Sequence, residues 1–152
     1  MNDEDADVIF ELCKGNSEYY KWCSKKNSKE LILHDLHITP PGINIGDKYY
    51  VGFYDNDELV AIMDLIDGYP EKDIAFIGFF MMNANRQGSG RGSALIDDLF
   101  AYLKDIGKTE VQLGIDADNP QSTHFWKKNG FETIREIINE EGTILYARRL
   151  LK

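Results

Sequence analysis

The sequence lacks any long hydrophobic run, and its 152 residues include only two cysteines, four prolines and three histidines. No apolar segment approaches the roughly 20 residues that cross a bilayer, so we expect no contact with membranes. The first five residues, Met-Asn-Asp-Glu-Asp, are acidic, whereas a secretory signal begins with basic residues and continues with apolar ones. These absences predict a soluble, cytoplasmic protein.

Basic side chains are also scarce: 17 Lys and Arg residues stand against 26 Asp and Glu residues, for a net charge of −9. Nucleic-acid binding needs clustered Lys and Arg, and the pairs Lys25-Lys26 and Arg148-Arg149 are too short to form a basic stripe. We therefore expect no nucleic-acid partner. An acidic surface can attract a cationic amine, but composition alone favours a role in solubility.

The two cysteines, Cys13 and Cys23, have no His or Cys nearby at the spacing of metal ligands. We interpret them as reduced, structural residues and expect no metal site.

The apolar share of 43% and the aromatic share of 12% are sufficient for one packed domain over residues 1–152. Two short helices are expected between Val8 and Cys23, the second capped by Ser17, and residues 31–36 fit either a helix or a strand. From Lys48 onward the pattern changes to strands. Residues 49–54, 59–66 and 74–82, separated by turn residues, predict an antiparallel meander.

The third strand leads into a glycine-rich turn, in which Gly88, Gly90 and Gly92 alternate, and then into a helix that ends at Gly107. The apolar stripe expected on that helix consists of Leu95, Leu99, Tyr102, Leu103 and Ile106. Alternating glycines let successive backbone N–H groups turn toward one point, and the start of a helix adds further N–H groups. This combination predicts a phosphate-binding loop.

The remaining elements are a strand at residues 110–115, a helix that Asn119 caps and Gly130 ends, and a hairpin of residues 131–138 and 143–150. The helix before residues 110–115 is a crossover from the strand at residues 74–82, which favours parallel pairing of these two strands. The predicted fold class is therefore α/β, in its α+β form, with a mixed and mostly antiparallel sheet.

Spacing separates the possible ligands of the glycine turn. A P-loop needs Lys-Ser or Lys-Thr after its last glycine, and a dinucleotide fingerprint needs Gly-x-Gly-x-x-Gly; neither pattern is present. A flexible surface turn is the remaining structural alternative. The run Gln87-Gly88-Ser89-Gly90-Arg91-Gly92 instead resembles the coenzyme A pyrophosphate loop of GNAT-superfamily N-acetyltransferases. The downstream segment from Asn119 to Gly130-Phe131 resembles a second motif of that superfamily.

The resemblance extends from about Tyr49 to the end of the chain. It implies a GNAT fold with helices flanking a sheet that is splayed at the cofactor strand, and acetyl-coenzyme A as cosubstrate. The backbone of the cofactor strand would pair with the pantetheine arm, the loop would hold the pyrophosphate, and Asn119 would contact the coenzyme. The implied cofactor-binding residues are Phe80, Met81, Met82, Gln87, Gly88, Ser89, Gly90, Arg91, Gly92, Ser93 and Asn119. Arg86 and Arg91 fit equally well as phosphate partners or as solvated turn residues.

Acetyl transfer to an amine needs a deprotonated amine, a polarised carbonyl and a stabilised thiolate. The backbone N–H near Met82 is the expected polarising group, and Asp64 is the candidate base because it interrupts an apolar strand. A buried partner or an exposed strand end would explain Asp64 equally well. Glu71 and Asp73 are weaker candidates for the base and would act through water. His34 and His37 are weak candidates for lining the acceptor side of the site.

Two departures from the resemblance stand out. Members of the superfamily commonly carry a tyrosine acid on the late helix, where this chain has Trp126, which we expect to be a packing residue. They also usually open with a strand, where this chain shows a helical pattern.

The predicted function is acetyl-coenzyme-A-dependent N-acetylation of a small-molecule primary amine, by direct attack. A protein N-terminus or lysine is the second choice of acceptor. The sequence leaves open whether the protein forms a homodimer. The acceptor pocket is expected to have a partly aromatic wall, drawn from Tyr19, Tyr20, Trp22, Tyr49 and Tyr69. The alternative from another class is a non-catalytic coenzyme-A-binding sensor or interaction module.

Overall fold

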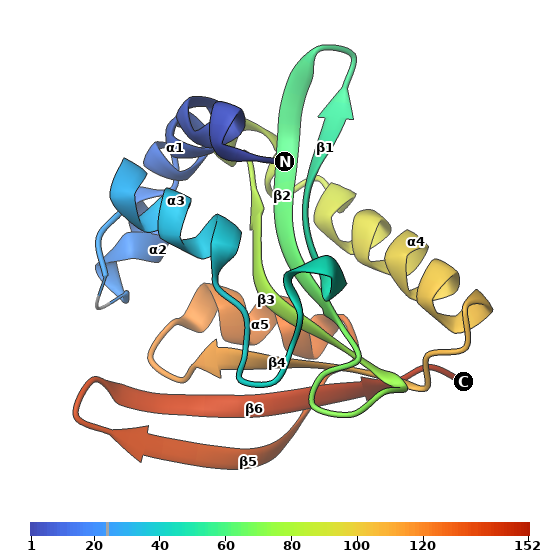
Figure 1. Ribbon diagram of the computed structural model, residues 1–152. Helices are drawn as coiled ribbons and strands as arrows, with labels where there is room; N and C mark the ends of the chain where they lie inside the picture. The colour runs from blue at the N-terminus through green and yellow to red at the C-terminus, as the bar shows by residue number, and fades with distance from the viewer. Residues whose placement is uncertain (24) are drawn as a thin grey trace.

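The computed structural model describes residues 1–23 and 25–152, which form a six-stranded sheet with helices on both faces (Figure 1). The strand order is β1-β2-β3-β4-β6-β5, and within these ranges only the β3–β4 pair is parallel. This arrangement confirms the predicted mixed, mostly antiparallel sheet. The strands are β1 (Lys48–Asp55), β2 (Glu58–Asp67), β3 (Ile74–Met82), β4 (Glu110–Asp116), β5 (Glu132–Asn139) and β6 (Gly142–Leu150).

Five α-helices and three short 3₁₀ turns accompany the sheet in the described part of the chain. The helices are α1 (Ala6–Lys14), α2 (Ser17–Lys21), α3 (Lys29–His37), α4 (Arg91–Asp105) and α5 (Pro120–Lys128). The turns are η1 (Asp3–Asp5), η2 (Ile45–Asp47) and η3 (Ala84–Arg86). None of the helices in the described ranges is long and apolar enough to cross a membrane.

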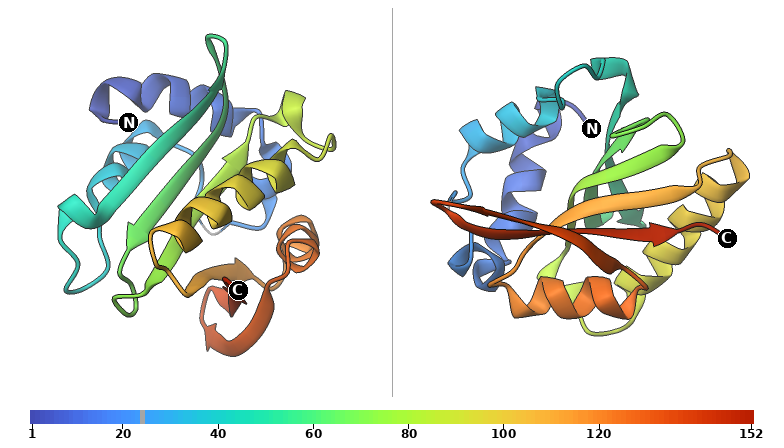
Figure 2. Two further views of the ribbon diagram at one scale, coloured as in Figure 1. Left: turned by 90° about the vertical axis from the view of Figure 1, so that its right-hand side faces the viewer. Right: turned by 90° about the horizontal axis from the view of Figure 1, so that it is seen from below.

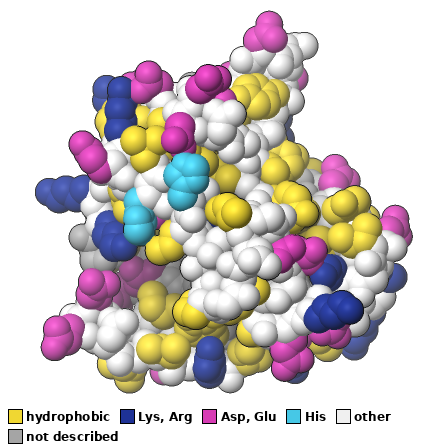
Figure 3. Space-filling view, in the orientation of Figure 1, with side chains coloured by type: hydrophobic (Ala, Val, Ile, Leu, Met, Phe, Trp, Pro, Cys, Tyr) yellow, Lys and Arg dark blue, Asp and Glu magenta, His cyan; other side chains and the backbone are white. Residues whose placement is uncertain are grey.

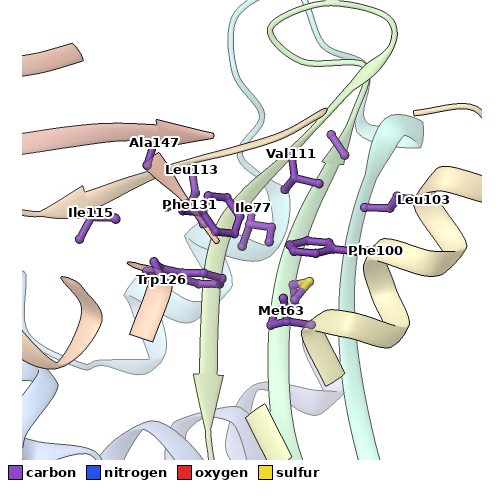
Figure 4. Close-up of a cluster of buried hydrophobic side chains, with 12 residues drawn as sticks. Met63, Ile77, Phe100, Leu103, Val111, Leu113, Ile115, Trp126, Phe131 and Ala147 are labelled. Atoms are coloured by element: carbon purple, nitrogen blue, oxygen red, sulfur yellow. The ribbon is translucent and has the colours of Figure 1, made fainter. Parts of the chain in front are cut away.

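Two hydrophobic clusters hold the layers together, one on each face of the sheet. Helices α1 to α3 cover one face, and α4 and α5 cover the other (Figures 1 and 2). Ile9 and Ile62, both fully buried, belong to the cluster under α1 and α3. Ile96, Phe100 and Trp126 belong to the other cluster, whose side chains converge on the sheet between α4 and α5 (Figure 4). The alternating residues of each central strand therefore serve two different cores.

The sheet splays open between β3 and β4. Their parallel pairing runs from Ile74 opposite Glu110 to Ile77 opposite Leu113, and β3 then continues to Met82 without β4. Near Ile77 the register between β2 and β3 shifts by one residue. Asp64 is opposite Phe79, whereas the next residue, Leu65, is opposite Ile77. Gly78 is the extra residue of this β-bulge, and a bulge bends a strand away from its neighbour. The predicted splay is present and has a local cause.

Several expectations about the helices are corrected. The buried stripe of α4 consists of Ile96, Phe100 and Leu103, whereas Tyr102 and Ile106 are exposed. Further residues expected on that stripe, Leu95 and Leu99, are half-buried. The buried residues Ile96 and Phe100 each follow an expected one, Leu95 or Leu99, by one position, and one position is a rotation of about 100° around a helix.

At the start of the chain, Ser17 is the first residue of α2 rather than its cap; Asn16 holds the cap position. The ambiguous segment is helix α3, capped by the Ser28 side chain, which accepts from the Leu31 N–H at 3.1 Å. No strand precedes α1 in the described residues, as the helical sequence pattern predicted. Instead the Met1 amino group donates to the Tyr50 carbonyl of the edge strand β1 at 2.7 Å.

Acidic and basic side chains are interspersed over the face seen in Figure 3, and the described residues gather no broad basic patch there.

Candidate functional site

The free edge of β3 presents backbone groups to the opening that β4 leaves. The Asn83 N–H bonds to the Val60 carbonyl at 2.8 Å, so Asn83 and Val60 form a hydrogen-bonded antiparallel pair. Because such pairs alternate along a ladder, the N–H groups of Met82 and Phe80 point away from β2. Two of the residues expected to contact the cofactor through their backbone thus face the splay.

The glycine loop that follows β3 is shaped by left-handed backbone. Gly88 has φ of 80° and Gly90 has φ of 79°, and a Cβ on either glycine would meet no atom within 4 Å. Gly90 is also the N-cap of α4, so the first N–H groups of that helix open onto the loop. A site of this kind suits a phosphate, because N–H groups and the positive end of the helix dipole converge there.

Gly92 has a different reason to lack a side chain. A Cβ at Gly92 would lie 3.2 Å from the Phe125 ring and 3.5 Å from Met82. The glycine therefore lets the first turn of α4 approach α5 and the end of β3.

Three side chains join the loop to the strand end and to the N-terminal helices. The Asn16 amide donates to the Leu12 carbonyl at 3.0 Å and to the Met82 carbonyl at 3.1 Å. The Gln87 amide donates to the Asn16 side-chain oxygen and to the same Met82 carbonyl, while Gln121 of α5 donates to Gln87. Sequence reasoning missed Asn16, which is 8% exposed and whose only visible signal was a turn residue after Gly15.

Arg86 and Arg91 are both engaged away from the loop. Arg86 pairs with Asp55 at 3.0 Å and with Glu58, and Arg91 approaches Asp55 at 3.3 Å. Hydrogen bonds from Arg86 and Arg91 lower the pKa of the Asp55 carboxyl. These contacts favour the turn-residue interpretation of the two arginines.

Three adjoining cavities form one cleft through the splay. The loop cavity, of about 360 Å³, is bordered by β3, the glycine loop and α5. The middle cavity, of about 80 Å³, lies where β3 and β4 diverge. The hairpin cavity, of about 210 Å³, lies between the end of α2 and the β5–β6 turn. Tyr19 borders all three, and Asn119 borders the middle and hairpin cavities.

The expected cofactor residues divide accordingly. Those that border the loop cavity are Phe80, Met81, Met82, Gln87, Gly88, Gly90, Gly92 and Ser93. Ser89 and Arg91 alternate with the glycines and do not border it. Asn119 is 1% exposed, and its side chain caps α5 by accepting from the Ser122 N–H at 3.2 Å.

The hairpin cavity combines acidic and aromatic residues. Asp116 and Glu141 border it, together with Tyr19, Trp22 and Cys23. Of the predicted aromatic wall, only Tyr19 and Trp22 border the cleft. Tyr20 interacts with Cys13, Tyr49 is exposed, and Tyr69 packs edge-on against Phe76 at 5.2 Å.

The two cysteines have different surroundings. Cys13 is buried, and burial raises the pKa of its thiol despite a hydrogen bond with Tyr20, so it remains protonated and unreactive. Cys23 lies at the hairpin cavity beside the Tyr19 side chain.

Trp126 is a packing residue, as expected. It is 8% exposed and contacts Phe125 and Phe131 edge-on, with ring centroids 4.8 and 5.1 Å apart. Its ring also lies 5.9 Å from Phe80, between the loop and middle cavities. Figure 4 shows it among the core side chains.

Asp64 forms a buried ion pair. Its Oδ2 accepts from Lys48 Nζ at 2.7 Å, and the two side chains are 13% and 2% exposed. The same Oδ2 lies 2.9 Å from the place of a Cβ on Gly78, so the carboxylate rests on the bulge. Burial raises the Asp64 pKa, against the lowering effect of Lys48. Asp64 borders none of the three cavities, and its role as a base stays a prediction.

The other candidates from the sequence lie apart from the cleft. His34 is exposed on α3, and His37 bonds to Asp3. Glu71 and Asp73 are exposed in the turn before β3, where Asp73 accepts from the Thr109 hydroxyl at 3.0 Å. Across the described ranges no group of three or more His, Cys, Asp or Glu residues is arranged to hold a metal ion.

Comparisons with known proteins agree with this geometry. The model of the acetyltransferase (GNAT) family matches residues 11–131. An uncharacterized N-acetyltransferase of Methanocaldococcus jannaschii is 25% identical over 114 residues, which make up 75% of this chain and 44% of that protein. The chain thus spans less than half the length of that relative.

Solved structures share the fold over nearly the whole chain. An acetyltransferase from Thermus thermophilus superposes with a TM-score of 0.78 at 20% identity, covering 99% of this chain and 94% of that one. The PaiA N-acetyltransferase of Thermoplasma acidophilum, in complex with coenzyme A, has a TM-score of 0.68 at 16% identity, covering 99% and 95%. With a family model that matches most of its length and a sheet that opens at β3, the chain belongs to the acetyltransferase (GNAT) family.

Proposed function

We propose that this protein transfers an acetyl group from acetyl-coenzyme A to the primary amine of a small molecule. The observation that carries the proposal is the single cleft that crosses the splayed sheet, with backbone donors at one end and acidic and aromatic side chains at the other. Such a cleft lets a donor and an acceptor approach one point from opposite sides.

The loop cavity suits coenzyme A. The N–H groups around Gly88 and Gly90, together with those at the start of α4, would hold the pyrophosphate. The free backbone edge at Phe80 and Met82 would pair with the amide groups of the pantetheine arm. A relative whose structure contains coenzyme A has the same fold, which supports this assignment.

Met82 is proposed to polarise the acetyl carbonyl through its backbone N–H. Acetyl-coenzyme A supplies a thioester, whose carbonyl oxygen gains negative charge when an amine attacks. A fixed N–H donor at that place stabilises the developing charge without reorganising. The Met82 carbonyl is held by both Asn16 and Gln87, so the peptide group that follows the Met82 N–H is fixed in orientation.

The hairpin cavity suits a cationic amine. Asp116 and Glu141 supply negative charge, Tyr19 and Trp22 supply ring faces, and no Lys or Arg among the described residues borders it. Part of the net charge of −9 thus faces the cleft, which favours attraction of an ammonium group. The size of about 210 Å³ favours a small molecule over a folded protein segment.

The amine is proposed to attack the thioester directly. Cys13 is buried with its thiol protonated, and Cys23 lies on the acceptor side of the cleft, so neither is placed as an acyl carrier. Asp64 stays the candidate base from the sequence, although its ion pair with Lys48 favours a structural role at the bulge.

Calorimetry with coenzyme A and thiol release from acetyl-coenzyme A with a panel of primary amines would test the proposal. We expect tight binding and acceptor-dependent release, strongest with diamines. Gly90→Trp should abolish both, because its side chain would fill the loop cavity and its backbone would be strained. Gly107→Trp is the matched control, since Gly107 also has a positive φ and open space around its Cβ position but lies outside the cleft. Binding without release over the whole panel would instead indicate a coenzyme A sensor.

A further inference from the structure

The leaving group of this reaction needs a proton, and two of the described side chains that border the middle cavity have hydroxyl groups. When the C–N bond forms and the C–S bond breaks, the electron pair of the broken bond goes to sulfur. A hydroxyl or ammonium donor beside the sulfur stabilises the thiolate or protonates it. The two hydroxyl groups belong to Tyr19 and Ser122, and the phenol of Tyr19 is a much stronger acid than the alcohol of Ser122. Asp116 also borders this cavity, but a carboxylate accepts rather than donates.

We propose that Tyr19 donates its hydroxyl proton to the departing sulfur of coenzyme A. The assignment rests on the proposed acetyltransferase function. Tyr19 is the one described residue shared by the loop, middle and hairpin cavities, so its side chain stands where donor and acceptor meet. The indole of Trp126, across the middle cavity, has no useful acidity.

The position of Tyr19 is fixed by contacts on both sides. Its ring packs edge-on against Phe79 of the cofactor strand at 5.9 Å and against Tyr20 at 5.0 Å. Asn16, the cap residue of α2, bonds to the Met82 carbonyl and accepts from Gln87. The helix that carries Tyr19 is thereby attached to the strand and loop that would hold the coenzyme.

The surroundings also keep Tyr19 in its donating form. Burial raises its pKa, and the neighbouring Cys23 and Asp116 raise it further, so the hydroxyl is protonated at neutral pH. After donation the tyrosinate would recover a proton from the acylated amine nitrogen through water. The amine thus loses one proton, sulfur gains one, and Tyr19 ends unchanged.

The thiol pKa of bound coenzyme A tests this role without knowledge of the acceptor. A hydroxyl that donates to the sulfur stabilises the thiolate and lowers that pKa. We would follow the thiolate absorbance of the complex during a pH titration and subtract the complex with S-methyl coenzyme A to remove Cys13 and Cys23. The wild type should lower the thiol pKa by about one unit relative to Tyr19→Phe, the worth of one charged hydrogen bond.

Tyr20→Phe is the matched control, because Tyr20 is adjacent in sequence, interacts with Cys13 and borders none of the three cavities. It should leave the thiol pKa at the wild-type value. Tyr19→Phe should also lower kcat about 10- to 100-fold with little change in KM for acetyl-coenzyme A. An unchanged thiol pKa and kcat in Tyr19→Phe would overturn the assignment and leave the acetyltransferase proposal intact. Failure of the wild type to bind coenzyme A would overturn both.

Discussion

The buried pair of Asp64 and Lys48 offers the sharpest test of a structural against a catalytic role. Lys48 is 2% exposed, so removing the Asp64 charge would leave an ammonium group buried without a counter-charge. Losing one partner of such a pair costs about 3–5 kcal/mol, whereas replacing both by apolar groups is often nearly neutral. We therefore expect Asp64→Asn and Lys48→Met each to lose about 3 kcal/mol of unfolding free energy. The double variant Asp64→Leu with Lys48→Met should recover most of it, since leucine has the branched shape of aspartate.

Acid dependence gives this prediction a second readout. Burial raises the folded-state pKa of Asp64, and Lys48 opposes that shift, so Lys48→Met should raise the pKa further. The pKa of this carboxyl is higher in the folded protein than in the unfolded chain. Below the unfolded-state pKa the protonated carboxyl contributes its full share to the free energy of unfolding, and that share is lost as the pH rises through the folded-state pKa. The stability deficit of Lys48→Met relative to the wild type should thus be largest at neutral pH and shrink as the pH falls through the raised pKa of Asp64.

Urea unfolding followed by circular dichroism, together with acetylation rate per folded molecule, would measure both effects. The exposed pair Lys21–Glu18 is the control, because Lys21→Met should change stability little. The structural account requires that Asp64→Asn lose stability while each folded molecule keeps its activity. An Asp64→Asn variant that is as stable as the wild type but lacks activity would refute this reasoning and restore Asp64 as the base.

Three further predictions concern the cleft. Gly78→Ala should destabilise the protein by about 1–3 kcal/mol, because its Cβ would lie 2.9 Å from the Asp64 carboxylate; a normal urea midpoint would contradict the bulge. Asn16→Asp should lower the free energy of unfolding more than Asn16→Ala does, since a carboxylate would face the Leu12 and Met82 carbonyls. It should also weaken coenzyme A binding, as measured by calorimetry. The exposed Asn85→Ala is its control, and equal stability of the two Asn16 variants would rule out the donor bonds. Arg91→Ala should reduce coenzyme A affinity less than threefold, as Arg91 faces Asp55; a tenfold loss would reveal a phosphate contact.

The loop end of the cleft, where we propose that coenzyme A binds, was predictable because the features that shape it are local. Positive φ at Gly88 and Gly90 and a cap at Asn119 are properties of short segments, and the sequence shows them through residue types that tolerate or need those conformations. The meander of β1, β2 and β3, the parallel β3–β4 pair and the β5–β6 hairpin also followed from local turns and one crossover, whereas the pairing of β4 with β6 was not predicted. The buried side of α4 was mispredicted because Leu95 and Leu99 have the same helical spacing as Ile96 and Phe100, so periodicity alone does not say which of the two apolar rows faces the sheet.

The hairpin end of the cleft, which we propose for the acceptor, was not predictable in the same way, because it is assembled from segments far apart in the chain. Tyr19, Asp116 and Glu141 come from α2, β4 and the β5–β6 turn, and nothing in their spacing brings them together. Asn16 is similar: its partner Met82 lies 66 residues away. Asp64 shows the converse limit, since an isolated acid in an apolar strand is equally well explained by a buried lysine 16 residues upstream.

The link between the two ends of the cleft has a consequence for substrate order. Gln87 belongs to the loop that would hold the pyrophosphate, and it donates to Asn16 at the start of α2. Tyr19 of the same helix borders the hairpin cavity. A ligand that orders the loop should therefore also order α2, so that coenzyme A binding would complete the hairpin cavity before an amine enters. Because coupling free energy is reciprocal, the acceptor should bind more tightly to the coenzyme A complex than to the protein alone, and Asn16→Ala should remove that difference. Calorimetric titration of an active amine, with and without coenzyme A, would measure it, and equal affinities in the wild type would show that the two ends act independently.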